Sequence, residues 1–408
     1  MKRVVITGIG VITPLGNERE QFRDRLLAGD SPVTVINHFD PAQLPTRIAA
    51  QATISPTDGA VRDRKVSFAQ SAARDAMVHA QASGRSLSDH YGAGSGGVCL
   101  GLGLELFSMP DLIDRLAGRA PAVGVHPLTV LQTPSDLCLH LISREHDLRQ
   151  PPLTHISACA ASTDALGAAM RLIRSGRRSW MLAGGTDSMI NPLGVAGFCK
   201  IQAISRRNDE PTRASRPFDV ARDGFVLGEG AAVLVLEALD AAQARGATIL
   251  AEIGGYGNSL DAHGISEPHP QGDGALSAMR GALTDAGITP EQVVHINAHG
   301  TGTPKNDVVE TIAIRRLCGA HTEQVSVSAT KSMIGHLISA SGAVEVAGLV
   351  LCANAGWVHP TINLDEQDPA CDLDVVRGAP RRIAGGWFLK NSFGFGGQNA
   401  ALALRIGA

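Results

Sequence analysis

The chain has 408 residues, 44% of them hydrophobic, and a formal net charge of −3. This length exceeds one ordinary hydrophobic core, so we expect two domains or one large duplicated fold. The near-neutral charge gives no indication of a nucleic-acid binder, and no segment reaches the length of a membrane span. The seven cysteines are scattered without a CxxC pair, which disfavours a disulfide framework or a zinc site and is typical of a cytoplasmic protein.

The first part of the chain predicts strands that alternate with helices. Residues 4–12 form a β-branched run typical of a buried strand, and residues 62–81 are expected to be helical. Gly8-Ile-Gly10 is only half of a dinucleotide fingerprint, because Thr13 stands where the third glycine would fall, so a nicotinamide site is not expected. The polar, proline-containing residues 105–150 indicate a helical cap inserted into the fold.

Cys159 has the position of a nucleophile. Thr154 to Ser157 predicts a short buried strand, and a helix with regularly spaced apolar residues is expected from Asp164 onward. Cys159 falls at the turn between them, where backbone N–H groups and the helix dipole would stabilise a thiolate. The alternative is a buried, inert cysteine, which is the commoner case.

The later part of the chain repeats features of the earlier part. Three stretches do so in the same order: 249–257 echoes 4–12, 326–331 with the following helix echoes 156–159 and its helix, and 397–405 echoes 230–237. These echoes predict two related β-α halves, residues 1–245 with the nucleophile and residues 246–408.

Two histidines in the second half stand at positions that suit chemistry. His299 ends a predicted strand and begins the loop Gly-Thr-Gly-Thr, while Lys331 and His336 lie on either side of a helix start. A lone histidine is usually structural, but a cysteine with two histidines is a plausible acyl-transfer set: one nucleophile and two imidazole N–H donors for an oxyanion. The Gly/Thr loop suits a phosphopantetheine arm or an ordinary turn.

Four motifs carry a resemblance to a known family: Ala158-Cys159-Ala160, Asn297 to Thr303, Lys331 to His336, and Asn391 to Gly397. With these motifs in this order the chain resembles the β-ketoacyl-[acyl carrier protein] synthases, elongating condensing enzymes of the thiolase-like superfamily, and looks closest to the type II branch. The resemblance implies an α/β, thiolase-like duplicated fold in five α-β-α-β-α layers. It also implies decarboxylative Claisen condensation with malonyl-[acyl carrier protein], in fatty-acid or type II polyketide or polyene biosynthesis.

The resemblance assigns roles to the catalytic residues. It implies that Cys159 holds the acyl chain as a thioester, and that His299 and His336 bind the malonyl thioester carbonyl and stabilise the enolate. It implies that Lys331 orders the site and pairs with a carboxylate, for which Glu310 is the matching candidate. No metal and no resident cofactor are implied, because the substrates arrive on the phosphopantetheine of acyl carrier protein.

Further roles follow from the same resemblance. The backbone N–H groups of Cys159 and Phe395 are expected to form the oxyanion hole, with Phe395 also as the gate of the acyl pocket. Thr301 and Thr303 match contacts to the pantetheine arm. Ile334 and Gln398 stand where the family pattern has threonine, and residues 105–150 match that pattern poorly. These departures leave the acyl substrate open.

The resemblance also predicts partners. A dimer, with an identical or a homologous subunit, is expected to form through the strand before Cys159, which we expect to be buried on both faces. Acyl carrier proteins are acidic, so a basic docking face is predicted from Arg62, Arg64, Lys65, Arg206 and Arg207. The alternatives are a chain-length-factor-like partner subunit, a thiolase acting on coenzyme A esters, and a non-enzymatic carrier-protein scaffold.

Overall fold

A computed structural model describes residues 1–54, 62–103, 109–119 and 134–407, and its central feature is one large mixed sheet. The strand order is β12-β10-β9-β14-β15-β8-β1-β7-β6-β4-β5. The two halves of the sheet meet where β1 (Val4–Ile12) pairs with β8 (Ala251–Leu260) in antiparallel register. Read outward from that junction, the two halves place corresponding strands in the same order, as a duplicated fold requires.

The strands of the sheet have these bounds: β4 Gly97–Gly101, β5 Leu153–His155, β6 Trp180–Ser188, β7 Glu229–Ala238, β9 Val293–Asn297, β10 Ser326–Ser328, β12 Asp374–Val375, β14 Gly386–Gly394 and β15 Gln398–Ile406. All residues of β1 and β7 are buried. Strands covered on both faces read as continuous apolar runs, which is why the sequence predicted them closely.

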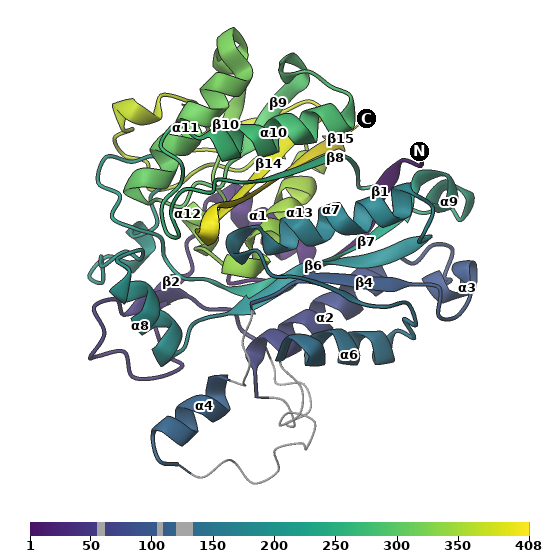
Figure 1. Cartoon of the computed structure of the whole chain (residues 1–408), viewed down its shortest axis with the longest axis horizontal. Coiled ribbons are helices and arrows are strands. Elements are labelled where there is room, and N and C mark those ends of the chain that lie inside the picture. Colours follow the sequence, from purple (N-terminus) through teal and green to yellow (C-terminus); the bar gives the residue numbers. More distant parts are fainter. Residues whose placement is uncertain (55–61, 104–108, 120–133, 408) are drawn as a thin grey trace.

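Helices separate and cover the two halves of the sheet, and Figure 1 shows the resulting five layers. The middle layer contains α1 (Arg19–Ala28), α7 (Ala161–Arg174) and α13 (Ser341–Asn354), and the two outer layers contain α2 (Arg64–His79) with α6 (Pro134–Glu145), and α10 (Asp273–Ala286) with α11 (Pro304–Cys318). Helix α13 is buried over nearly its whole length because sheets lie on both sides of it. The predicted α-β-α-β-α architecture is confirmed.

Several short elements complete the chain. They are β2 (Val33–Val35), β3 (Ile48–Ala50), α3 (Leu87–Tyr91), α4 (Met109–Leu116), α8 (Pro192–Lys200), α9 (Leu239–Ala244), α12 (Lys331–Ile334), β11 (Trp357–Val358) and β13 (Arg381–Arg382). Short 3-10 turns connect them, and three of these, at 158–160, 338–340 and 395–397, border the site described below. None of the helices in the described ranges is both long and apolar enough to span a membrane.

The predicted cap over residues 105–150 is only partly supported. Helix α6 packs against α2, and its residues Leu137, Cys138 and Ile142 share one apolar cluster with Phe68. This part of the segment therefore belongs to the outer helix layer, not to a separate cap. Residues 104–108 and 120–133 lie outside the described residues. The division of the chain into two domains at residue 245 stays a prediction.

Candidate active site

The turn that carries Cys159 links the edge strand β5 to helix α7. Ala158 has a φ of +48°, a left-handed conformation that is uncommon for a residue with a side chain, and it turns the chain sharply. Gly394 packs closely here, since a Cβ on it would lie 3.1 Å from the Cys159 backbone nitrogen. The turn places the Cys159 thiol, which is 3% exposed, at the base of a pocket. The predicted position of Cys159 between strand and helix is confirmed.

The expectation of a stabilised thiolate is wrong for the protein without substrate. Burial raises the pKa of the Cys159 thiol to about 12, although the Lys331 ammonium acts in the opposite direction. The backbone N–H groups of Phe395 and of Cys159 also favour the thiolate, so both groups lie near the sulfur, and the oxyanion hole that they are expected to form stays a prediction. The thiol is thus protonated at rest, and these donors serve the negative charge that forms during reaction.

His336 presents a donor to the cysteine. Its Nε2 lies 3.0 Å from the Cys159 Sγ, and its Nδ1 accepts the backbone N–H of Ile338 at 3.2 Å. Because Nδ1 is an acceptor, the ring proton of the neutral imidazole is on Nε2. Burial, followed by the charges of Lys331 and Lys390, lowers the pKa of His336 well below its ordinary value. His336 is therefore a neutral N–H donor and not a resting base for the thiol.

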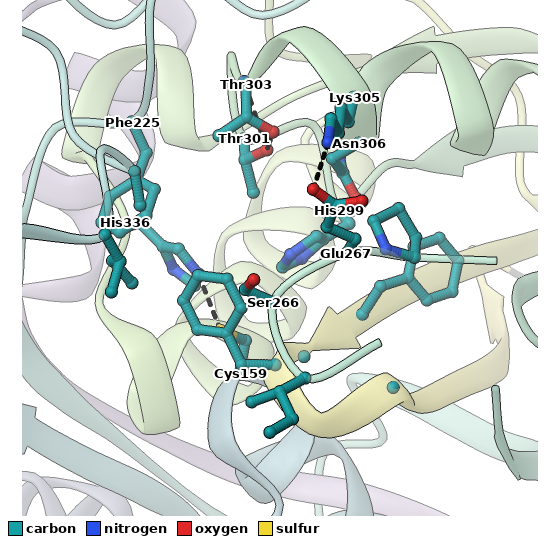
Figure 2. A pocket seen from close by; sticks show the side chains of 18 of the residues that line it. Cys159, Phe225, Ser266, Glu267, His299, Thr301, Thr303, Lys305, Asn306 and His336 are labelled. Atoms are coloured by element: carbon teal, nitrogen blue, oxygen red, sulfur yellow. Dashed lines mark hydrogen bonds and ion pairs between the residues drawn. The ribbon is translucent and has the colours of Figure 1, made fainter. Parts of the chain in front are cut away.

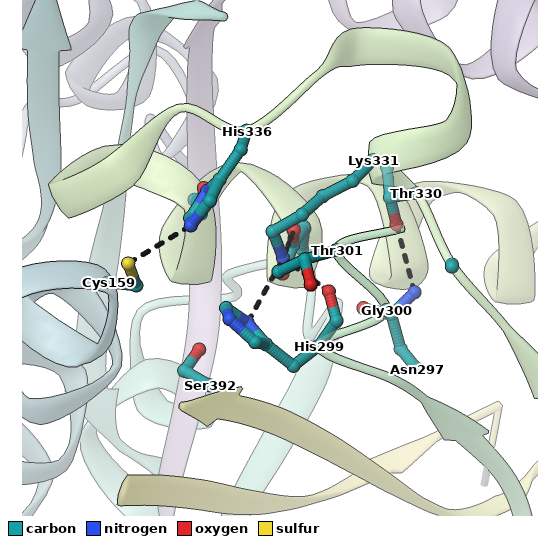
Figure 3. A network of polar contacts seen from close by, with 12 residues as sticks. Cys159, Asn297, His299, Gly300, Thr301, Thr330, Lys331, His336 and Ser392 are labelled. Carbon is teal, nitrogen blue, oxygen red and sulfur yellow. Dashed lines mark hydrogen bonds and ion pairs between the residues drawn. The ribbon is translucent and has the colours of Figure 1, made fainter. Parts of the chain in front are cut away.

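Lys331 orients His299 so that its Nε2 also carries the ring proton. The Lys331 Nζ lies 3.2 Å from the His299 Nδ1 and donates to the His299 carbonyl oxygen at 2.7 Å. An ammonium can only donate, so Nδ1 is the acceptor and Nε2 again carries the proton. The rings of His299 and His336 meet edge to face with centroids 5.3 Å apart, and burial lowers the pKa of His299 well below its ordinary value. Figure 3 shows Cys159 and both rings directed toward a common space.

The predicted carboxylate partner of Lys331 is wrong. The Lys331 Nζ is bonded to the Glu345 Oε1 at 2.5 Å, and Glu345 lies on α13 with a fully buried side chain. Glu310 instead accepts the backbone N–H groups of His299 and Gly300, each at 2.8 Å. It therefore holds the loop that follows β9, while Glu345 neutralises the lysine. Both carboxylates fix His299, one through its backbone and the other through Lys331.

The pocket above these groups has a volume of about 360 Å³ and is lined by Cys159, His299, His336 and Phe395 among others. Thr301 and Thr303 line it on the side away from Cys159, with their hydroxyl oxygens 2.9 Å apart (Figure 2). The two departures from the family pattern lie elsewhere. Ile334 is buried in the main apolar core, and Gln398 lines an open hollow beside β5.

The second half contains a turn that corresponds to the one at Cys159, and sequence reasoning misplaced it. Ile338 has a φ of +46°, begins the 3-10 turn 338–340, and leads into α13 as Ala158 leads into α7. The sequence echo aligned Lys331 with Cys159, but the extra helix α12 lies between β10 and this turn. The glycine and alanine content of α13 could have located this turn in the sequence. The length of the inserted segment that contains α12 could not be predicted from the sequence.

The predicted docking residues do not form one basic face. Lys65 is buried, with its Nζ 3.4 Å from Asp63, so its assignment to a docking surface is wrong. Arg64 is bonded to the buried Glu229 at 2.7 Å. Arg62 pairs with Asp114. Residues 206 and 207 follow the pocket wall at 201–203 by a few positions, with Arg206 exposed and Arg207 partly buried.

The three central side chains also have the spacing of a metal site. The ligand atoms of Cys159, His299 and His336 all lie within 4.8 Å of one another. The Lys331 ammonium, however, lies directly behind His299 and would repel a cation. The charge around the cluster suits an anion, such as an oxyanion or enolate, better than a metal ion.

Comparisons with known proteins agree with this geometry. Residues 1–242 match the family model described as beta-ketoacyl synthase, N-terminal domain, and residues 250–365 match the C-terminal domain model. The 3-oxoacyl-[acyl-carrier-protein] synthase 2 of Coxiella burnetii is 41% identical, with 99% of this chain and 98% of the relative covered. That of Synechocystis sp. is 40% identical, with the same coverage.

Solved structures of the same fold are also similar. A beta-ketoacyl synthase from Burkholderia phymatum is 35% identical over the full length of both chains, with a TM-score of 0.88. A ketosynthase in complex with its type II polyketide synthase acyl-carrier protein has a TM-score of 0.89 at 29% identity and covers 99% of each chain. With both family models matched and relatives about 40% identical over nearly the whole length, the chain belongs to the beta-ketoacyl synthase family.

Proposed function

We propose that the chain is a 3-oxoacyl-[acyl-carrier-protein] synthase, an acyltransferase that elongates a Cys159-bound acyl chain by two carbons from malonyl-[acyl carrier protein]. The observation that carries this proposal is the convergence of one buried thiol and two neutral Nε2–H donors in one pocket. The thiol can form a thioester, and the two donors face the space where a malonyl thioester carbonyl would lie.

The first half-reaction transfers the acyl chain to Cys159. The thiol sulfur attacks the thioester carbonyl of the acyl carrier protein, and the oxyanion is held by the N–H groups of Cys159 and Phe395. The carbon–sulfur bond to phosphopantetheine then breaks, and the departing sulfur takes the proton that Cys159 loses. His336 holds its proton on Nε2 throughout, so it orients the cysteine sulfur and does not act as its base.

The second half-reaction forms the new bond. Malonyl thioester loses CO₂, and the enolate oxygen is stabilised by the Nε2–H groups of His299 and His336. The enolate carbon attacks the Cys159 thioester, and the Cys159 thiolate that leaves takes a proton from water. No external base is needed, because the electron pair of the broken carbon–carboxylate bond supplies the nucleophile.

Two alternatives fit the site less well. A chain-length-factor-like subunit has no need of the complete set Cys159, His299, His336 and Lys331. A thiolase needs a second cysteine as base, but Cys159 is the only cysteine among the described residues that line the pocket, and Cys371 lies in a different apolar cluster. All seven cysteines are buried and unpaired, which supports a cytoplasmic location.

Intact-protein mass spectrometry tests the proposal. Incubation with a panel of acyl-[acyl carrier protein] thioesters is expected to add the mass of one acyl group to the wild type and none to Cys159→Ala. The chain that adds fastest identifies the preferred substrate. Absence of any adduct on the wild type across short, long, saturated and unsaturated chains would refute the proposal.

The proposal includes docking of acyl carrier protein through Arg206, which is exposed and follows the pocket-lining residues 201–203 in the chain. Carrier proteins are acidic, so Arg206→Glu is expected to raise KM for carrier-bound substrates roughly tenfold while leaving small thioester substrates unaffected. Arg149→Glu, a charge reversal on a different exposed arginine, is the control and should leave KM unchanged for both kinds of substrate. An equal change of KM for both substrate types would contradict docking through Arg206.

A further inference from the structure

Lys390 is a buried cation that has no role in the two half-reactions described above. It lies on β14 and follows the apolar residues Phe388 and Leu389. Its side chain has no exposed surface, and its Nζ lies 2.6 Å from the Glu345 Oε2. It also donates to the Ser392 hydroxyl at 2.9 Å and to the Asn391 carbonyl oxygen.

Glu345 is shared by two lysines. Lys331 binds its Oε1 at 2.5 Å and Lys390 binds its Oε2 at 2.6 Å, so the buried group Lys331–Glu345–Lys390 has a formal charge of +1. The nearby Glu310 is not bonded to either lysine: it accepts backbone N–H groups and the Asn391 amide, and its charge acts on Lys390 only from a greater distance. Burying an excess charge costs several kcal/mol, about as much as pairing recovers, so fold stability does not explain a lysine here.

The buried group Lys331–Glu345–Lys390 is connected both to His299 and to the helix that follows Cys159. On one side Lys331 contacts the His299 Nδ1 at 3.2 Å. On the other side Lys390 bonds Ser392, whose hydroxyl lies 2.7 Å from the hydroxyl of Thr163 in the first turn of α7, four residues after Cys159. A continuous set of polar contacts therefore runs from His299 to the helix behind the nucleophile.

We propose that Lys390 is a positioning residue for the condensation: it holds the second oxygen of Glu345 so that Lys331 is fixed against His299, and it keeps the buried group positively charged beside the anions that form during reaction. This inference rests on the proposed function, in which a thiolate and an enolate develop in the pocket. Fixed positive charge in a site closed to water stabilises such anions strongly. The same charge favours neutral His299 and His336, the forms that donate from Nε2.

The proposal predicts a dependence on pH that is specific to Lys390. The charged and titratable groups around it are Glu345 on α13, Lys331 on α12, Glu310 on α11, and His299 and His336 in the turns. Burial lowers the pKa of Lys390 to about 8. Above that pH the group loses its net positive charge, so CO₂ release from malonyl-[acyl carrier protein] should decline. The Cys159 thiol has a pKa of about 12 and does not account for a decline near pH 8.

The test compares CO₂ release by wild type, Lys390→Met and Arg245→Met between pH 6 and pH 9.5. Lys390→Met should lower kcat about tenfold or more with KM unchanged, and the decline near pH 8 should disappear. Arg245→Met removes another buried cation bonded to a buried glutamate, Glu237, outside the pocket. It should lower stability but keep the wild-type kcat and pH profile. Where Lys390→Met does not fold, Lys390→Gln, which keeps a donor for Ser392, is measured instead.

The outcomes separate this inference from the function on which it rests. A wild type that releases no CO₂ from malonyl-[acyl carrier protein] would overturn both. A wild type that releases CO₂, with Lys390→Met or Lys390→Gln unchanged in kcat and still declining near pH 8, would overturn the inference alone.

Discussion

His299 and His336 both donate from Nε2 because a fixed donor occupies each Nδ1: the Lys331 ammonium for His299 and the Ile338 backbone N–H for His336. A neighbouring cation and complete burial both oppose protonation, so neither ring gains a proton near its ordinary pKa. The two donors therefore remain unchanged over the pH range in which a free histidine titrates.

This arrangement predicts that decarboxylation is not slowed by mild acid. CO₂ release by the Cys159→Ala variant, which isolates the second half-reaction, should not decrease as the pH falls from 7.5 to 6. The folded-state pKa values of His299 and His336 lie well below 6.5, so proton uptake begins only at lower pH. Initial rates of CO₂ release across this range provide the measurement. A midpoint near pH 6.5 would show that one ring titrates normally.

At the residue scale the sequence identified the reacting groups but not what supports them. Cys159, His299, Lys331 and His336 were found because they stand in motifs at the ends of strands. Glu345 was missed because it becomes the partner of Lys331 only when α13 packs back beneath the site, and no local spacing reports that. Lys390 reads in sequence as part of an apolar strand.

At the scale of elements, the turn before each middle-layer helix is the part on which the site depends. Ala158 and Ile338 hold matching left-handed conformations, and these aim Cys159 and the end of the His336 loop at one pocket. The long buried strands were predictable from their apolar runs. The two turns were not, because alanine and isoleucine give no signal for a positive φ and only the packing of the two halves imposes it.

The turn at Ala158 predicts a contrast between two substitutions. Ala158→Val should destabilise the fold by about 1–2 kcal/mol and slow acylation of Cys159, because a β-branched residue resists a left-handed φ. Ala158→Gly, which adopts a positive φ freely, should keep the acylation rate. Chemical denaturation and the rate of acyl-adduct formation measure the two effects. Equal acylation rates for valine and glycine would refute a role for this turn.

At the scale of the whole molecule, the sheet ends at β5 with an unpaired edge. Among the described strands β5 pairs only with β4, and Thr154 and Ile156 at this edge are exposed, Ile156 to 47%. The prediction that this strand is buried on both faces is therefore wrong for the single chain. Such an edge invites pairing with a second subunit, which would complete its burial.

We expect the chain to form a dimer through β5, with itself or with a homologous subunit. Ile156→Lys should weaken that dimer, because the lysine charge would be buried at the interface. Val78→Lys, on the exposed face of α2, is the matched control and should leave the dimer intact. Sedimentation velocity at micromolar concentration measures both. A wild-type chain that is monomeric and fully active under these conditions would contradict the prediction.

The most direct test of the account separates the two half-reactions in two variants. Cys159→Ala should lose acylation and condensation completely and still release CO₂ from malonyl-[acyl carrier protein], because both imidazole donors remain. His299→Ala should keep acylation of Cys159, while CO₂ release falls by roughly a hundred- to a thousandfold, as for loss of one oxyanion donor. Condensation by Cys159→Ala, or a His299→Ala variant that releases CO₂ normally but cannot be acylated, would contradict this division of roles.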